Sequence, residues 1–277
     1  MCPSAIVTMY YDVITTIGYS IKMELWPQWE LFRNDNGSFE QSELQIEVSP
    51  DIQSKYGIDI LANQPGTAVF RCADCILSTN SDWTKAKLNL FDGIRGETLA
   101  IYKVLNTLLF THLSTRQAIQ IHASLVQIKN TGLMFLGPSG IGKTTQAELW
   151  MKYRGAEIIN GDMVFVKQGS DHFLGCGSPW HGSSPYCLNR QVPLSALIVL
   201  KQSQQNSIRR LTGFEMVSTV LNSVFLPSWY LEGYKAACDT VDVLLRTVPV
   251  YELSCRPDED AVHLTEETVF GKSNILL

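Results

Sequence analysis

Residues 133–145 read Leu-Met-Phe-Leu-Gly-Pro-Ser-Gly-Ile-Gly-Lys-Thr-Thr, and this stretch decides the fold. An apolar run leads into the pattern G-x-x-x-x-G-K-T, and the sequence that follows has helical character. This is the complete Walker A motif in its setting of strand, loop and helix. Backbone N–H groups of such a loop converge on an anion, and the start of the helix adds partial positive charge. The sequence therefore predicts a site for a nucleoside triphosphate, and a glycine turn that only lets a helix pack on a strand is the alternative.

Each part of this loop has an expected task. Lys143 is expected to reach the outer phosphates, and the hydroxyl of Thr144 is expected to ligate Mg²⁺. ATP and Mg²⁺ are therefore the predicted ligands. The other predicted nucleotide contacts come from the remainder of the loop, namely Gly137, Ser139, Gly140, Ile141, Gly142 and Thr145.

The composition describes a globular chain without a nucleic-acid or membrane partner. Its 277 residues allow one large or two ordinary domains. The formal net charge is −5, and no stripe of Lys and Arg exists to neutralise phosphates along a duplex. The first residues lack the pattern of a signal peptide, and no apolar run reaches transmembrane length. A cytoplasmic location is expected.

The two halves of the chain differ in texture. Residues 1–95 are expected to form a small β-rich or mixed domain, because short apolar and polar segments alternate there. The expected elements are strands over residues 17–23, 44–48 and 67–70 and a turn at residues 34–37. Helical spacing of apolar residues predicts a connecting helix over residues 96–114, and residues 115–277 then form the domain that carries the glycine-rich loop.

The seven cysteines raise the question of a metal site. Cys72 and Cys75 have the spacing of half a zinc knuckle or of a redox pair, but no second pair completes a zinc site. The other five are scattered singly. Reduced and mostly buried thiols are expected.

The second half begins with a hairpin. A strand over residues 118–128 is followed, after a turn at residues 129–132, by the strand that leads into the glycine-rich loop. So short a connection can only join antiparallel strands, because a parallel crossover needs a dozen or more residues. The helix after the loop should end at Gly155, with glycine as its C-terminal cap.

The remaining elements are expected to form the core and its cover. Helical spacing extends over residues 215–230 and 236–246, followed by a strand over residues 248–255 and a helix from Asp258 onward.

An acidic residue for the metal is expected at Asp162. The strand Ala196–Leu200 ends in Lys201, so it lacks the aspartate of an ordinary Walker B motif. Asp162 lies instead in a polar turn between two apolar segments that follow the helix after the loop. Carboxylates suit Mg²⁺, although an aspartate in a turn can also serve only to cap a backbone N–H.

Several stretches together carry a resemblance to a known family. These are Ile121–Val126 before the hairpin turn, the glycine-rich loop itself and the Asn160-Gly161-Asp162 turn. Together they resemble the HPr kinase/phosphorylase core, an α/β P-loop fold with a mixed sheet that is related to phosphoenolpyruvate carboxykinase. Later stretches are similar to shorter HPr-kinase-like proteins, including kinases of lasso-peptide and other ribosomally made precursor peptides; these are Gly177–Gly182, Val192–Leu200 and Ile208–Leu211. The resemblance as a whole covers about residues 115–265.

The resemblance implies roles for individual residues. The family's turn holds two adjacent aspartates, of which the second ligates Mg²⁺ and the first acts as base. Asp162 matches the metal aspartate, and Gly161 stands at the position of the base. No loop typical of the phosphorolysis half-reaction is recognisable. The resemblance therefore implies a homo-oligomeric kinase without phosphorylase activity, whose substrate is not HPr.

Two histidines and one arginine are further candidates. His122 matches a histidine near the active site of the resembled kinases, and His181 lies in a loop rich in Gly, Ser and Pro that can close over a substrate. Either can act as a base or as a charge-stabilising donor, or be an ordinary strand or loop histidine. Arg190 is a candidate phosphate contact. The three other histidines, His112, His172 and His263, are expected at the surface.

The leading prediction is an Mg·ATP-dependent kinase that phosphorylates a serine hydroxyl of a peptide or small protein. Asp162, His122 and Lys143 are its predicted catalytic residues. Two alternatives remain: a kinase of a free hydroxy amino acid or other small molecule, and a nucleotide-binding regulatory module without catalysis.

Overall fold

The computed structural model describes residues 9–14, 17–21, 26–34, 44–52, 59–64, 67–71, 74–91 and 99–271. The chain divides into two compact units. The first comprises residues 1–116 and 227–234, and the second comprises residues 117–226 and 235–277. The short segment 227–234 thus belongs to the first unit, although it lies far along the sequence. It includes the first four residues of helix α4 (Leu231–Thr247), whose remainder belongs to the second unit.

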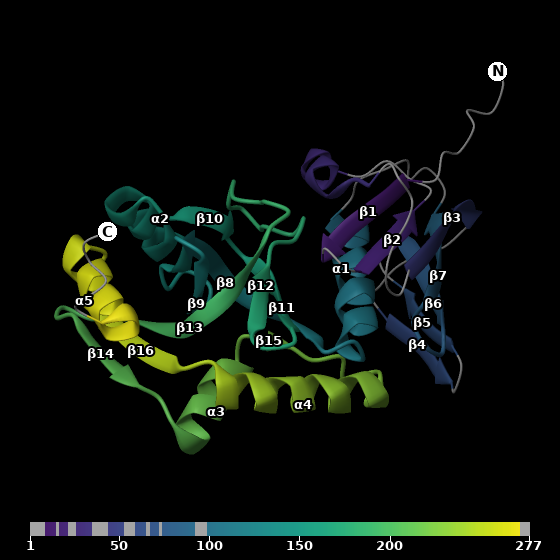
Figure 1. Cartoon of the computed structure of the whole chain (residues 1–277). Coiled ribbons are helices and arrows are strands. Elements are labelled where there is room, and N and C mark those ends of the chain that lie inside the picture. Colours follow the sequence, from purple (N-terminus) through teal and green to yellow (C-terminus); the bar gives the residue numbers. More distant parts are fainter. Residues whose placement is uncertain are drawn as a thin grey trace. The chain divides into compact units, whose positions relative to one another are not determined.

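The described residues of the first unit form a seven-stranded sheet with two helical elements (Figure 1). The strand order is β1-β2-β3-β7-β6-β5-β4. The β2–β3 and β3–β7 pairs are parallel, and the other pairs are antiparallel. Its elements are β1 (Met9–Ile14), β2 (Ile17–Ile21), a 3-10 helix η1 (Pro27–Phe32), β3 (Leu44–Ile52), β4 (Asp59–Gln64), β5 (Thr67–Arg71), β6 (Cys75–Asn80), β7 (Lys85–Phe91) and α1 (Leu99–Ser114).

Most of the described residues of this half lie in strands, and β2, β3 and β5 cover the described parts of the three expected strands. The aromatic side chains of Trp29 and Phe32 are buried in the unit's core. The expected turn at residues 34–37 and Cys72 lie largely or wholly outside the described residues. Helix α1 begins at Leu99 and belongs to the first unit. The sequence predicted that this helix connects the two domains.

The second unit is an α/β structure with a mixed sheet, as expected. Its strands are ordered β10-β8-β11-β12-β13-β16-β14, with β9 between β8 and β13 and with β15 beside β8. The elements are β8 (Ala118–Ile128), β9 (Thr131–Leu136), α2 (Lys143–Arg154), β10 (Glu157–Asn160), β11 (Met163–Gln168), β12 (Phe173–Cys176), β13 (Gln191–Gln202), β14 (Ser207–Arg210), α3 (Gly213–Leu221), β15 (Val224–Phe225), α4 (Leu231–Thr247), β16 (Val250–Cys255) and α5 (Glu259–Phe270).

The β8–β9 hairpin is antiparallel, which confirms the inference from its short connection. The turn is tighter than expected, because Ile128 already pairs with Thr131. Strand β9 then pairs in parallel with β13, and β13 pairs in parallel with β16. The carboxyl ends of β9, β13 and β16 therefore meet at one edge of the sheet, where open α/β sheets bind their ligands.

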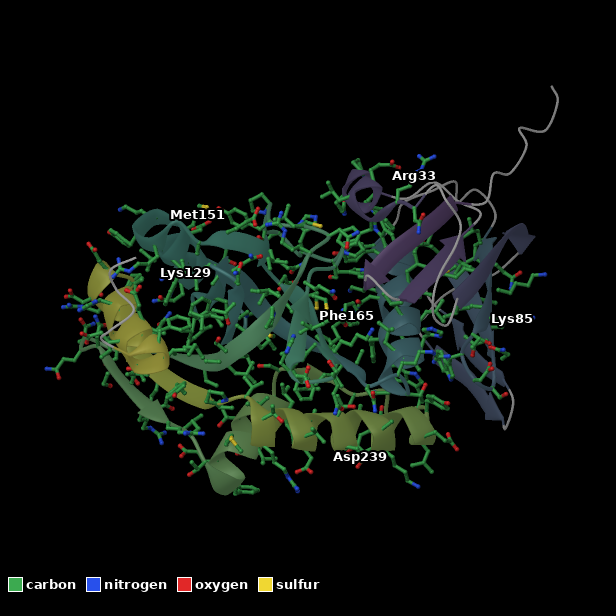
Figure 2. The ribbon with its side chains drawn as sticks, in the orientation of Figure 1. Arg33, Lys85, Lys129, Met151, Phe165 and Asp239 are labelled. Carbon is green, nitrogen blue, oxygen red and sulfur yellow. The ribbon has the colours of Figure 1, made fainter. Side chains whose placement is uncertain are left out.

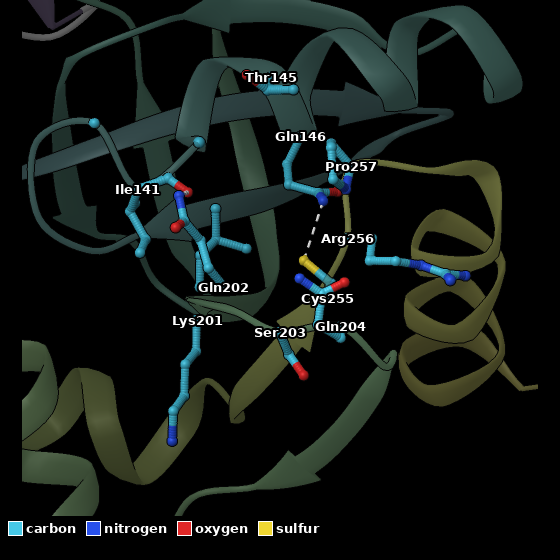
Figure 3. Close-up of a pocket in the computed structure, with 13 residues that line it drawn as sticks. Ile141, Thr145, Gln146, Lys201, Gln202, Ser203, Gln204, Cys255, Arg256 and Pro257 are labelled. Atoms are coloured by element: carbon cyan, nitrogen blue, oxygen red, sulfur yellow. Dashed lines mark hydrogen bonds between the residues drawn. The ribbon is translucent and has the colours of Figure 1, made fainter.

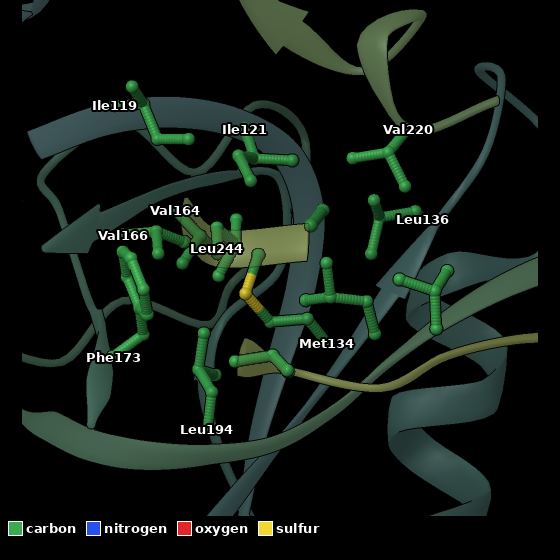
Figure 4. Close-up of a cluster of buried hydrophobic side chains, with 14 of the residues drawn as sticks. Ile119, Ile121, Met134, Leu136, Val164, Val166, Phe173, Leu194, Val220 and Leu244 are labelled. Carbon is green, nitrogen blue, oxygen red and sulfur yellow. The ribbon is translucent and has the colours of Figure 1, made fainter. Parts of the chain in front are cut away.

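Two apolar clusters hold the sheet from its two faces. Alternation along β9 sends Met134 and Leu136 into one cluster and Leu133 and Phe135 into the other. Figure 4 shows the first cluster, in which strand residues such as Ile121 meet helix residues of α3 and α4. The second cluster is covered by α2 and α5. Each buried side chain of this size contributes about 1.5–3 kcal/mol through removal from water.

The ends of the helices follow local chemistry. Helix α2 ends at Gly155, which is in the left-handed conformation (φ 64°) and donates its N–H to the Met151 carbonyl. Asp258 caps α5 by accepting a hydrogen bond from the N–H of Ala261 at 3.1 Å. Met151 is half-exposed on α2, and Phe165 on β11 is fully buried (Figure 2).

One expected helix is shorter than predicted. The helical spacing over residues 215–230 gives only α3, which ends at Leu221. Val224 and Phe225 instead form the short strand β15, which pairs with Ile121 and Gln120 of β8. Pairing with β8 satisfies backbone groups of this segment that a continued helix would have satisfied internally.

Candidate active site

The glycine-rich loop joins the end of β9 to the start of α2. Gly142 is the N-cap of α2 with φ 113°, and Gly140 has φ 77°. Both values lie in the left-handed region, where a side chain is strained. An added Cβ at either glycine meets nothing within 4 Å, so backbone conformation and not space requires glycine there. The loop thus leaves open space in front of the N-terminus of α2.

The side chain of Lys143 folds back onto the glycine-rich loop. Its Nζ donates to the carbonyls of Gly137 at 3.0 Å and Pro138 at 3.2 Å. The side chain is buried, and this burial lowers the pKa of Lys143, while Asp162 opposes the shift. A cation held so near the carboxylate of Asp162 and the loop can bind a phosphate that enters between them.

Strand register brings His122 to Asp162. Met163 of β11 pairs with His122 of β8, so the turn just before β11 lies against the middle of β8. The Asp162 carbonyl accepts from the Ala123 N–H at 2.9 Å. His122 Nε2 then lies 2.9 Å from Asp162 Oδ1. Because a carboxylate only accepts, His122 donates through Nε2 and orients Asp162.

The turn that carries Asp162 is held from several sides. The Gly161 carbonyl accepts from Ser124 Oγ at 2.9 Å and from Thr144 Oγ1 at 3.4 Å. Asn160 is fully buried, and its Oδ1 accepts from the N–H groups of Asp162 and Met163, each at 2.9 Å. The turn, β8 and the start of α2 are thereby fixed to one another.

Asn160 also ties this turn to a second loop. Its Nδ2 donates to the carbonyls of Ser178 at 2.9 Å and Trp180 at 3.2 Å. Sequence reasoning did not select Asn160 as a site residue. Its position before Gly-Asp indicates a turn, but nothing local signals partners 18 and 20 residues further along the chain.

The loop of residues 180–184 packs directly on the turn. A Cβ added at Gly161 would lie 1.9 Å from Ser184 Oγ, and one added at Gly182 would lie 2.6 Å from Asp162 Oδ2. Both contacts are closer than real Cβ atoms approach, so glycine at the two positions allows this packing. Ser184 therefore occupies the space into which a carboxylate at position 161 would project.

His181 lies in the same loop. Its Nδ1 is hydrogen-bonded to the Ser184 carbonyl. Since a carbonyl only accepts, Nδ1 carries the proton in the neutral ring and Nε2 keeps its lone pair. His181 is partly exposed, and the loop histidine considered above as an ordinary surface residue forms part of a cavity wall.

One cavity of about 250 Å³ collects most of the predicted residues. Its walls combine the loop and helix start with the turn and the 180–184 loop. The predicted residues that line it are Ser139, Gly140, Gly142, Lys143, Thr144, Thr145, Asp162, His122 and His181. Two serines that sequence reasoning did not select, Ser183 and Ser184, line it as well.

A second cavity of about 700 Å³ lies on the other side of the loop (Figure 3). It occupies the edge where β9, β13 and β16 end, and residues such as Gln146, Gln202 and Cys255 line it. Ile141, one of the predicted nucleotide contacts, lies here and not in the smaller cavity. Gly140, Gly142 and Thr145 line both cavities.

Arg190 and the three histidines without a motif lie outside both cavities, and their predicted positions are only partly correct. Arg190 forms an ion pair with Glu157 and lines neither cavity, so the structure does not bring it to the site. The expectation that His112 lies at the surface is wrong. It is fully buried in the first unit, where its Nδ1 donates to the Trp83 carbonyl at 2.6 Å. His172 and His263 are exposed, as expected.

The cysteines of the described residues are free thiols, as expected. Cys75, Cys176, Cys187 and Cys255 are buried, and Cys238 is partly exposed. Burial raises the pKa of Cys255 to about 11, so it remains protonated near neutral pH. In the part of the chain that the structure describes, no helix has the length and apolar character needed to cross a membrane.

Comparison with known proteins gives little further information. No family model and no curated protein matches the chain. Among solved structures, the HPr(Ser) kinase/phosphatase from Coxiella burnetii covers 54% of this chain and 95% of its own, at 13% identity and a TM-score of 0.35. A likeness of this size establishes neither a shared activity nor a shared substrate.

Proposed function

We propose that this protein is an Mg·ATP-dependent kinase that transfers the γ-phosphoryl group to a serine hydroxyl of a peptide or small protein. The observation that carries the proposal is the smaller cavity. It gathers a Walker A lysine and threonine, the Asp162 carboxylate and two histidines around the N-terminus of a helix. These are the groups that phosphoryl transfer needs, because it proceeds mainly by positioning and charge stabilisation.

The phosphates of the donor are bound by the loop in this proposal. Its backbone N–H groups and the N-terminus of α2 attract an anion. Lys143, now bonded to two loop carbonyls, exchanges these partners for phosphate oxygens. The charge of Lys143 then lies beside the bond that breaks, between the γ-phosphorus and the bridging oxygen of the leaving ADP.

The residues present fit Mg²⁺. Thr144 offers a hydroxyl and Asp162 a carboxylate, and both line the same cavity. Mg²⁺ prefers such oxygen donors, with phosphates and water completing its shell. Bound there, it would neutralise charge on the β- and γ-phosphates. His122 holds the carboxylate in place through its bond to Oδ1, so its role is to position Asp162.

We assign the base to His181. Its Nε2 has a lone pair because Nδ1 donates to the Ser184 carbonyl. Its side chain lines the same cavity as Gly161, which has no carboxylate to act as base. The serine hydroxyl of the acceptor gives its proton to Nε2 as its oxygen bonds to the γ-phosphorus. Such a base typically contributes about 10²–10⁴-fold to the rate.

A free hydroxy amino acid is the second candidate acceptor. A cavity of about 250 Å³ has room for a γ-phosphate and one small side chain, which favours neither a peptide nor a free amino acid. A regulatory module without catalysis is favoured only by the missing carboxylate at position 161, and His181 offers a replacement for it. A homo-oligomeric state and a location in the cytoplasm, where ATP is available, complete the proposal.

Incubation with γ-labelled ATP tests the proposal. Candidate acceptors are a precursor peptide encoded beside the gene and free serine or threonine, with Lys143→Ala as the inactive control. The expected result is Mg²⁺-dependent transfer of label to one of these acceptors by the natural protein, and no transfer by Lys143→Ala. If ATP binds but label reaches no acceptor, the kinase assignment is refuted and the binding module remains.

A further inference from the structure

The cavity of about 700 Å³ beside the glycine-rich loop has no role in the phosphoryl chemistry described above. Its volume lies within the range of small-molecule pockets, about 300–1,000 Å³. It is formed where three parallel strands end, by the chain after β13 and the chain after β16. All of its lining residues belong to the second unit.

The two cavities share one wall. Gly140, Gly142 and Thr145 line both, and the catalytic groups lie only on the side of the smaller cavity. An elongated ligand that passes over these residues therefore has its outer phosphates beside Lys143 and Asp162. Its other end then lies in the larger cavity. For a nucleoside triphosphate, this other end is the nucleoside.

Gln146 supplies a specific feature within the larger cavity. It is the fourth residue of α2 and is only 3% exposed. Its Nε2 donates to Cys255 Sγ at 3.2 Å, as the dashed line in Figure 3 shows. Its Oε1 is buried and has no hydrogen-bond partner among the described residues. An unpaired buried acceptor is costly, and a ligand with a suitable N–H group removes this cost.

The remainder of the lining favours a flat, uncharged ring. Ile141, Leu200 and Pro257 contribute apolar surface. In Figure 3 the charged group of Lys201 points away from the Gln146–Cys255 pair. That of Arg256 is directed toward helix α5, where it pairs with Asp258 at 2.8 Å. The charges of both side chains are therefore turned away from the cavity's interior.

The hydrogen-bonding groups of the lining distinguish between adenine and guanine. No carboxylate is among the described residues that line this cavity. A guanine ring presents two adjacent donors, N1–H and the 2-amino group, for which a carboxylate is the matching partner. An adenine ring presents one exocyclic amino group, which matches the single free acceptor of Gln146. Cys255 holds the amide with Nε2 toward sulfur, which leaves Oε1 for this amino group.

We propose that the larger cavity binds the nucleoside of the donor and that Gln146 selects adenine by accepting a hydrogen bond from its 6-amino group. This inference rests on the proposed function, since it takes the donor to be a triphosphate held by the loop. Gln146 is then a specificity-determining residue and takes no part in phosphoryl transfer.

Direct binding measurements separate the two claims. Mg²⁺ complexes of ATP and of purine riboside triphosphate, which has hydrogen in place of the 6-amino group, are titrated into the natural protein by calorimetry. The expected dissociation constant is at least about tenfold lower for ATP, as expected for one buried hydrogen bond. Inosine triphosphate, with a 6-oxo group opposite Oε1, should bind no better than purine riboside triphosphate.

The variant Gln146→Met tests the residue itself. It keeps the length of the side chain but removes the acceptor, so ATP and purine riboside triphosphate should bind with equal affinity. Gln205→Met, an exposed change outside both cavities, is the matched control and should keep the tenfold preference.

The outcomes are distinguishable. Equal binding of ATP and purine riboside triphosphate by the natural protein overturns the selection of adenine by Gln146, and this measurement needs no variant. A preference that survives in a folded Gln146→Met protein also overturns it. If neither triphosphate binds, the proposed function fails, and the nucleoside assignment fails with it.

Discussion

At the scale of single residues, the site depends on how neighbouring groups orient two side chains. Asp162 is held by His122 through a 2.9 Å hydrogen bond, and His181 is held by the Ser184 carbonyl. Neither orientation follows from the residue type alone. The orientation of Asp162 follows from the contact of its Oδ1 with His122, and that of His181 from the contact of its Nδ1 with the Ser184 carbonyl. Each leads to a separate expectation for a variant.

Asp162→Asn should remove turnover while the protein remains folded. The amide can still contact His122, but it lacks the charge that binds Mg²⁺. Loss of one such electrostatic contact typically costs about 10²–10³-fold in kcat. Steady-state kinetics and a thermal melt test this expectation. A variant with full activity would refute the metal role of Asp162.

His181→Gln should lower kcat by about 10²–10⁴-fold with little change in KM for ATP. Glutamine keeps a polar group of similar size at this position but offers no ring nitrogen that could accept the proton of the acceptor hydroxyl. His172→Gln, at an exposed position, serves as the control. A folded variant that retains the full kcat would show that another group is the base.

At the scale of elements, the decisive contact is between the 160–163 turn and the 180–184 loop. Asn160 connects them by hydrogen bonds, and glycine at positions 161 and 182 allows their close approach. The loop thereby supplies His181 to the cavity. Packing of this kind is rigid, so an added methyl group should be felt as strain.

Gly161→Ala should lower the free energy of unfolding by about 1–3 kcal/mol, because the new Cβ meets Ser184 Oγ and Cβ. Ser184→Gly removes both of these atoms, so the double variant should recover most of the loss. Urea denaturation of the two single variants and the double variant measures the coupling. Strictly additive effects would show that the two positions do not touch.

Local sequence explains part of these elements and not the remainder. The stretch 133–145 predicts its strand, loop and helix because all of the determining residues are adjacent. Gln146 and Cys255 are 109 positions apart, and their contact depends on the β13–β16 pairing. Val224 and Phe225 have helical spacing, yet pairing with β8 makes them a strand. Tertiary contacts that no local pattern encodes decide such cases.

The whole molecule consists of two compact units. The cavities and all residues assigned to the proposed reaction belong to the second unit. The first unit has a buried polar residue of its own in His112, which sequence analysis placed at the surface because no motif surrounds it. A helical position on α1 did not reveal on which side of the helix the ring lies.

His112 should make stability depend on pH. Burial lowers its pKa from 6.5 to about 4, and its Nε2 has no hydrogen-bond partner among the described residues. Between these values the unfolded chain binds a proton more readily, so stability is full above pH 6.5 and falls as the pH approaches 4. The slope should reach about 1.4 kcal/mol per pH unit.

Urea denaturation of the natural protein and of His112→Phe between pH 4 and pH 8 measures this dependence. The variant should lose the part of the slope due to this histidine, although its stability at pH 8 also falls because the bond to the Trp83 carbonyl is absent. His172→Phe is the matched control at an exposed site. Identical slopes in all three proteins would contradict a depressed pKa at His112.

In the proposed function, residues 137–145 and Asp162 form one site for Mg·ATP. Calorimetric titration of Mg·ATP into the natural protein, into Lys143→Ala and into the natural protein without Mg²⁺ tests it most directly. We predict saturable binding of one nucleotide per chain, which Lys143→Ala abolishes and removal of Mg²⁺ weakens. No binding by the folded natural protein, or undiminished binding by Lys143→Ala, would contradict the claim.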